Sequence, residues 1–240
     1  MGDHEYTFPF DTCETPREHG VAQPYSALFN LVNCAIILYF LCKTTQLPTF
    51  VLLLSIGCFE LFHLFSHIVH ITGPIQINIT HSLTYWMNLS FFYVFYSYTR
   101  QLPDMTFLLY LLAIVCFDIY AFLRLSIVYY LSSQSILFVS MLMYYFPLLP
   151  NHVQTSIYYI TLLVGLIIVL FLNEKYNCRR MLEWFPQFPW HVLIETVGIV
   201  LFYVICSHFY DLHLPIGGHT TNPNSSSSRS VNFDLDLCSK

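Results

Sequence analysis

Four ionisable side chains stand close together in one apolar stretch of the sequence. Glu60, His63, His67 and His70 are spaced by three, four and three residues, so a helix would place them along one stripe. Two imidazoles one helical turn apart can bind the same metal ion. Ionisable groups at membrane depth are costly and usually mark function. The stripe therefore indicates a metal site or a polar pathway.

Further candidates stand at the starts of later apolar runs. His70 ends the second run, His81 opens the third and His191 opens the seventh, so a seven-helix bundle would bring these three to one end. Glu195 follows His191 by four residues, on the same helical face one turn deeper. His63 lies seven residues before His70, about 10 Å deeper at the helical rise, and we expect it to miss His191. His70, His81 and His191 are therefore candidate ligands of one metal ion, with Glu195 as a further ligand or as a hydrogen-bond partner of the imidazole.

Zinc at such a site would supply hydrolytic chemistry. A catalytic zinc needs three protein ligands and an open position for water. The bound water becomes hydroxide-like near neutral pH and can attack an amide or ester carbonyl. The residues alone do not select three ligands, and His67 stays an alternative. The alternative is that these histidines lie at the membrane interface, are solvated by water and bind no metal.

The composition indicates that these residues belong to a membrane protein. Of the 240 residues, 56% are hydrophobic and only 10% are charged, whereas soluble domains usually carry about 25% charged residues. So few charges cannot coat a water-facing surface, which argues against a soluble enzyme and against a disordered chain. The net charge of -5 and the lack of a basic face argue against nucleic acid as a partner.

Seven apolar runs, separated by charges and prolines, are each long enough to cross a bilayer as a helix of about 20 residues. We predict helices because a lipid-exposed backbone must satisfy its own hydrogen bonds. The expected fold is an all-α, seven-transmembrane helix bundle over residues 21–212, between an acidic segment at 1–20 and a polar, disordered tail at 213–240. Merging the fourth and fifth runs at Arg124 would leave six spans. The predicted spans are 25–42, 48–72, 81–99, 105–123, 127–146, 153–172 and 190–210.

Several short motifs occur along the chain, and their order relative to the predicted spans can be compared with that of known membrane proteins. They are Asp11-Thr12-Cys13-Glu14 before the first span, Ser66 and His70 at the end of the second, Glu174 four residues before Cys178, and Trp190-His191 opening the seventh. In this order, and with seven spans, the chain resembles the alkaline ceramidases. These are intramembrane zinc amidases of a superfamily that includes the adiponectin receptors.

The resemblance implies both an activity and a set of residues. The family hydrolyses the ceramide amide to a sphingoid base and a fatty acid, so a ceramide-like membrane lipid is the expected substrate. Zinc would be held by the histidines of spans two and seven, and Ser66 would assist the metal-bound water. Calcium would bind near Asp11 and Glu14. A disulfide would join Cys13 to Cys178.

The implied disulfide also suggests an orientation. Disulfides persist in oxidising compartments, so the N-terminus would be luminal and the C-terminal tail cytosolic, in an endoplasmic reticulum or Golgi membrane. A glycosylation sequon at Asn78-Ile79-Thr80 is consistent with that side being luminal.

The sequence also departs from the family pattern. The family has two histidines four residues apart in span seven, and Gln187 occupies the first position in this register. His81 stands where the family has an aspartate. An alternative register, with zinc at His63 and Phe59 in place of the serine, fits the motif less well. We predict a rebuilt zinc amidase in which His70, His81 and His191 bind zinc. The rivals are a non-catalytic, lipid-binding or receptor-like relative and a small transporter.

Overall fold

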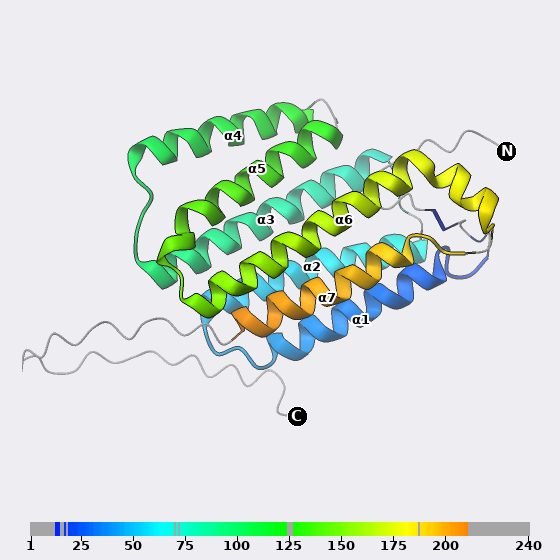
Figure 1. The fold of residues 1–240 in the computed structure, drawn as a ribbon, viewed down its shortest axis with the longest axis horizontal. Coiled ribbons are helices and arrows are strands. Elements are labelled where there is room, and N and C mark those ends of the chain that lie inside the picture. The colour runs from blue at the N-terminus through cyan, green and yellow to red at the C-terminus, as the bar shows by residue number, and fades with distance from the viewer. Residues whose placement is uncertain are drawn as a thin grey trace, which may run out of the picture.

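The structure is a computed structural model that describes residues 13–14, 17, 19–69, 71, 73–123, 127–186 and 188–210. Over these ranges the chain forms seven α-helices and no strand, which confirms the all-helical fold class (Figure 1). One short 3-10 helix, η1 (Phe146–Leu148), follows the fifth helix. The α-helices are α1 (Pro24–Leu41), α2 (Leu47–Val69), α3 (Gly73–Thr99), α4 (Met105–Leu123), α5 (Ile127–Tyr145), α6 (Asn151–Trp184) and α7 (Val192–Phe209).

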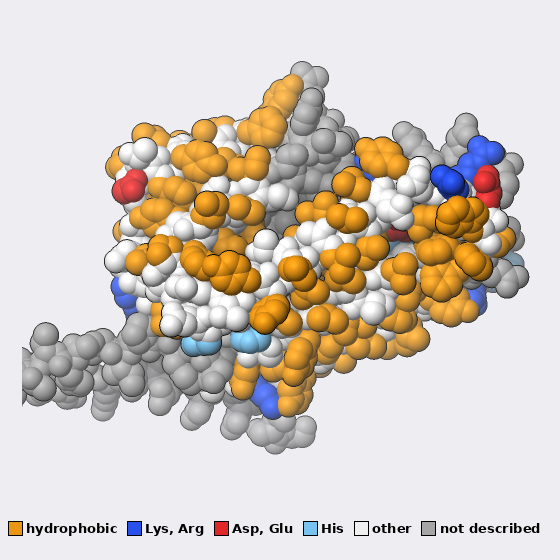
Figure 2. Space-filling model, in the orientation of Figure 1, with side chains coloured by type: hydrophobic (Ala, Val, Ile, Leu, Met, Phe, Trp, Pro, Cys, Tyr) orange, Lys and Arg blue, Asp and Glu red, His pale blue; other side chains and the backbone are white. Residues whose placement is uncertain are grey.

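Four of the described helices, α1, α2, α6 and α7, are long and apolar enough to cross a membrane. Shorter apolar stretches occur in α4, at Met105–Tyr120, and from α5 into η1, at Ser133–Leu148. On the visible face the charged side chains lie toward the two ends of the molecule, and hydrophobic side chains cover much of the middle (Figure 2). This distribution is typical of a membrane protein.

Two helices are longer than the apolar runs that predicted them. α3 begins at Gly73, ahead of the predicted start at His81, and α6 continues to Trp184, past the predicted end at Leu172. Hydropathy marks the part of a helix that suits lipid, whereas polar residues continue the helical backbone beyond it. Gly73 has a φ of 76°, a conformation that glycine adopts without strain, and it turns the chain from α2 into α3.

The helices pack so that α1 lies against both α2 and α7. α6 packs against α7, α3 against α2 and α5, and α4 against α5 (Figure 1). α1 and α7 both begin at the end of the bundle where α2 and α6 finish (Figure 1). The first turns of α7 and the last turns of α2 therefore lie at the same end.

The interior of the bundle changes character along its length. α2 buries Leu52 in its first half and His67 near its end, while α7 buries Glu195 in its first turn and Ile205 further on. Hydrophobic burial stabilises the apolar half, whereas buried polar groups require partners. The opposite half, where α2 ends and α7 begins, is the polar end of the bundle. Its other buried polar side chains are Glu14, Gln23, Ser26, Asn30, Asn33, Glu60, Ser66, Gln76, Thr80, Glu174 and His191.

Candidate metal centre

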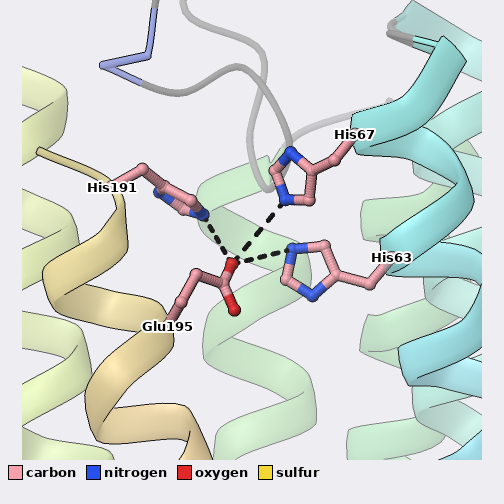
Figure 3. Close-up of side chains that lie close together, drawn as sticks. All are labelled: His63, His67, His191 and Glu195. Carbon is pink, nitrogen blue, oxygen red and sulfur yellow. Dashed lines mark hydrogen bonds and ion pairs between the residues drawn. The ribbon is translucent and has the colours of Figure 1, made fainter. Parts of the chain in front are cut away.

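Four side chains at the polar end of the bundle can hold one metal ion. They are His63 and His67 on α2, His191 immediately before α7, and Glu195 in the first turn of α7. One ligand atom from each of the four lies within 4.8 Å of the other three. Figure 3 shows the three imidazoles turned toward the Glu195 carboxylate, which lies between the two helices.

The spacing of the ligand atoms suits a small ion. Glu195 Oε1 lies 2.8 Å from His191 Nε2, 3.4 Å from His63 Nε2 and 3.7 Å from His67 Nε2. Zinc bonds of about 2.0–2.1 Å in tetrahedral geometry separate the ligand atoms by about 3.3 Å. The three separations from Glu195 lie on both sides of that value, and all four ligand atoms lie within 4.8 Å of one another, so small rotations of the side chains would let three of them bind one tetrahedral ion.

The tautomer of His67 follows from its second nitrogen. Gln23 donates from Nε2 to the backbone carbonyl of Glu14 over 3.1 Å, which leaves Gln23 Oε1 facing His67. That oxygen lies 2.6 Å from His67 Nδ1, and because it can only accept, Nδ1 carries the hydrogen. In the neutral imidazole, His67 Nε2 then presents a lone pair to the cluster.

His191 is oriented in the same way by a carboxylate. Its Nδ1 lies 2.9 Å and 3.2 Å from the two oxygens of Glu174, a residue of α6 that is 2% exposed. Metal-binding histidines commonly donate their second N–H to a carboxylate or carbonyl, which fixes the ring and raises the basicity of the ligand nitrogen. Glu174 and Gln23 therefore play the part that such outer partners play in metal sites.

Without a cation, these assignments point several electron-rich atoms at one another, and a second proton on His191 would relieve only the shortest of these contacts. With Nδ1 protonated, a neutral His191 directs a lone pair at Glu195 Oε1 from 2.8 Å, and His67 directs another from 3.7 Å. Electron-rich atoms this close repel one another unless a cation lies among them. A proton can bridge only one of the pairs, whereas a metal ion satisfies all the ligands at once. The donor set and its geometry therefore fit a bound metal ion.

One side of the cluster is more open and adjoins a second buried acid. The His63 side chain is 14% exposed, the most accessible of the four. Its Nδ1 lies 3.8 Å from Glu60 Oε1, and Asn33 Nδ2 donates to the other Glu60 oxygen over 3.2 Å. A polar group entering the bundle could approach the cluster on the His63 side.

The structure brings together only part of the ligand set predicted from the sequence. His191 and Glu195 belong to the cluster, with His63 and His67 as the partners from α2. His81 instead lies against α4, where its Nε2 is 2.7 Å from Asp118 Oδ2, so this imidazole joins α3 to α4. His70 and Asp11 lie outside the described residues.

Two further predicted residues serve the helix backbone. Ser66 is buried, and its hydroxyl donates to the carbonyl of Phe62 over 2.9 Å within α2. The Glu14 carboxylate accepts from the backbone N–H groups of Tyr25 and Ser26, each at 3.0 Å, and from the Ser26 hydroxyl at 2.5 Å. Glu14 thus caps the N-terminus of α1, where unpaired N–H groups attract a negative charge. Because both oxygens are used there, we do not propose calcium binding by Glu14.

The Cys13–Cys178 disulfide implied by the family resemblance is confirmed, with the two Cα atoms 5.6 Å apart. It ties the N-terminal segment to α6, one helical turn beyond Glu174. The backbone N–H of Cys13 also donates to Glu174 Oε1 over 2.5 Å. The disulfide therefore stands next to the carboxylate that orients His191.

Removing this disulfide should destabilise the protein. Because the bridge closes a loop with a sequence separation of 165 residues, we expect Cys178→Ser to lower the free energy of unfolding by about 2–4 kcal/mol. Thermal unfolding in detergent would measure the loss as a lower melting temperature. The matched control is Cys116→Ser, since Cys116 is a free, exposed cysteine on α4. Equal melting temperatures for the two variants would contradict the prediction.

Comparisons with known proteins add no further assignment. No family model matches the chain, and no curated protein or solved structure is significantly similar to it.

We expected His191 to lie level with His70, whereas the structure places it level with His63 and His67. His191 contacts Glu174, which lies ten residues before the end of α6 at Trp184, or about 15 Å along the helix. The chain thus returns toward the bundle interior before α7 begins. The available signal was the four-residue spacing, which His63 and His67 share with His191 and Glu195.

Proposed function

We propose that this chain is an intramembrane zinc hydrolase that cleaves the amide bond of a ceramide-like lipid. The observation that carries the proposal is the buried cluster of three imidazoles and a carboxylate, formed by the polar ends of two apolar helices. A site of this kind inside an apolar bundle is accessible to lipids rather than to large water-soluble substrates.

Zinc is the metal that we propose, because its preferred ligands are histidine nitrogens and carboxylate oxygens in tetrahedral geometry. The ceramidase resemblance supports the same choice. The family pattern requires two span-seven ligands four residues apart, and His191 and Glu195 have that spacing. In this register the substitution at Gln187 no longer removes a ligand.

Each residue of the cluster has a definable task. His67 and His191 bind through Nε2, held in orientation by Gln23 and Glu174. Zinc, when bound, supplies a Lewis acid and lowers the pKa of water to near neutrality.

Glu195 and His63 complete the proposed chemistry. Glu195 would be the third zinc ligand beside His67 and His191, which leaves the fourth position open for water. His63 accepts the proton of the attacking water and returns it to the amine nitrogen as the carbon–nitrogen bond breaks. The products are a fatty acid and a sphingoid base. His63 is the most exposed of the four, so we place the entry of the substrate carbonyl on its side of the cluster.

We further propose that the protein crosses the membrane seven times, with the metal centre toward the lumen of the endoplasmic reticulum or Golgi. The Cys13–Cys178 disulfide lies at the same end of the bundle as the metal centre, and disulfides persist in oxidising compartments. The same assignment leaves the C-terminal tail in the cytosol.

A combined metal and activity measurement tests the proposal. The full chain, purified in detergent, should contain about one zinc per molecule, as a single site requires. It should release fatty acid from a fluorescent ceramide, lose this activity with a chelator, and regain it when zinc is added back. Folded protein without bound metal would overturn the proposal. Bound zinc with no hydrolysis of ceramide would favour the non-catalytic, lipid-binding alternative.

A further inference from the structure

Among the described residues, two buried polar side chains near the start of α3 have no hydrogen-bond partner. Gln76 is 0% exposed and Thr80 is 3% exposed. Within the described part of the chain, neither amide atom of Gln76 nor the hydroxyl of Thr80 has a hydrogen-bond partner. The two residues are one helical turn apart, so they present their polar atoms on the same buried face of α3.

Leaving these groups unpaired costs free energy, and Thr80 also differs from the other hydroxyl side chains of α3. Leaving a buried donor or acceptor unpaired costs about 1–3 kcal/mol, and most buried polar groups in native proteins are paired. Other hydroxyls of this helix donate to the carbonyl four residues earlier, as Thr84, Ser90 and Thr99 do over 2.8 Å. Thr80 does not make this bond. Its hydroxyl is therefore available to a group from outside the protein.

The two side chains lie at the depth of the metal centre. α2 and α3 pack side by side and are joined by a short turn, so positions equally far from the turn are level (Figure 1). His67 lies two residues before the end of α2, and Gln76 lies three residues after the start of α3. His63 and Thr80 form a second level pair, six and seven residues from the turn. Each pair differs in depth by about 1.5 Å, one residue of helical rise.

We propose that Gln76 and Thr80, on the buried face of α3 and level with the metal centre, bind the polar head of the lipid substrate. The inference rests on the proposed function, since it assigns these residues to the substrate of that reaction. The Gln76 carboxamide offers donors and an acceptor, which complement the C=O and N–H of a secondary amide. The Thr80 hydroxyl complements a hydroxyl group. Both side chains are neutral, so they select an uncharged head that carries an amide and hydroxyls.

The sequon that includes Thr80 does not account for its burial. Asn78-Ile79-Thr80 matches the glycosylation pattern, but acceptor sites lie in surface loops, and this segment belongs to a helix with Thr80 buried. Asn78 itself is exposed. Its substitution therefore provides a control that removes the sequon and keeps both proposed binding groups.

The test uses Gln76→Leu and Thr80→Val in the full chain. Apolar replacements remove polar atoms that have no partner in the free protein, so the melting temperature without lipid should stay the same or rise. Binding of a fluorescent short-chain ceramide should weaken by about 3- to 10-fold for each hydrogen bond lost. We expect this loss in Kd and KM, with kcat and zinc content close to those of the unchanged protein. Asn78→Gln should leave all four quantities unchanged.

A matched lipid separates head recognition from general lipid binding. Diacylglycerol of the same chain length keeps a hydroxyl but lacks the amide N–H, so Gln76→Leu should weaken its binding less than it weakens the binding of ceramide. A lower melting temperature of the lipid-free Gln76→Leu and Thr80→Val variants would show a structural role and overturn the proposal. An unchanged ceramide Kd would also overturn it and leave ordered water as the partner. If the unchanged protein binds no zinc but its ceramide affinity still depends on Gln76, the hydrolase proposal fails while the head-binding site stands.

Discussion

Replacing His191 with alanine should remove the metal from the purified protein and lower ceramide hydrolysis by at least about 10³-fold, because the activated water is lost with the zinc. His191 is the best-held member of the cluster, since Glu174 orients its Nδ1 and its Nε2 lies 2.8 Å from Glu195 Oε1. His67→Ala should have the same effect. Elemental analysis for zinc and a fluorescent ceramide assay measure the two consequences separately.

The control for this experiment also decides between two ligand sets. His81→Ala removes an imidazole that pairs with Asp118, so it should keep the zinc even if the packing of α3 against α4 is weakened. His70→Ala tests the other ligand predicted from the sequence. Zinc retained by His67→Ala but lost from His81→Ala would restore the sequence-based set and refute the cluster described above. Zinc retained by His191→Ala would contradict both sets.

The helices could be predicted because the apolar runs are long and clearly interrupted. α4 has the predicted bounds, Met105–Leu123, since Asp104 precedes the apolar run and Arg124 follows it. The start of α3 could not be predicted in this way. Its first turns contain Gln76 and Thr80, which read as a loop by hydropathy but are buried in the helix.

The site could be predicted only in part, because spacing along one helix says nothing about depth relative to another. His191 and Glu195 were identifiable from their four-residue spacing. Assigning their partners on α2 required the depth of His191, which depends on how far α6 extends beyond Glu174. His81 was chosen because it opens an apolar run, yet α3 begins earlier and His81 pairs with Asp118.

The N-terminal segment connects the features that the sequence motifs suggested separately. Glu14 accepts from Gln23 through its carbonyl and caps α1 through its carboxylate, and Gln23 in turn contacts His67. Cys13 donates to Glu174, the partner of His191. His67 is thus linked through Gln23 to Glu14, and His191 is linked through Glu174 to the neighbouring residue, Cys13. This arrangement explains why a segment before the first span bears on a site between α2 and α7.

Glu174→Gln should lower the zinc affinity by about 10- to 100-fold, the range found for outer partners of metal-binding histidines. The single amide oxygen of the glutamine, placed at the Oε1 position, can still accept from the Cys13 N–H and, over a longer distance, from His191 Nδ1, so the fold and the disulfide should persist. What is lost is the negative charge that makes the imidazole a stronger ligand. Competition with a chelator of known zinc affinity measures the change.

The control for Glu174 lies on the same helix. Glu183 pairs with Arg179 at the surface, where its side chain is 63% exposed, so Glu183→Gln removes the same charge far from the cluster and should leave zinc affinity unchanged. Equal affinities in the Glu174 and Glu183 variants would mean that Glu174 serves only to anchor Cys13. A selective loss in the Glu174 variant, with an unchanged melting temperature, would assign the carboxylate to the metal site. The Glu174→Gln variant thus distinguishes a metal centre, whose affinity depends on the buried charge, from a polar cluster that only stabilises the packing of the helix ends.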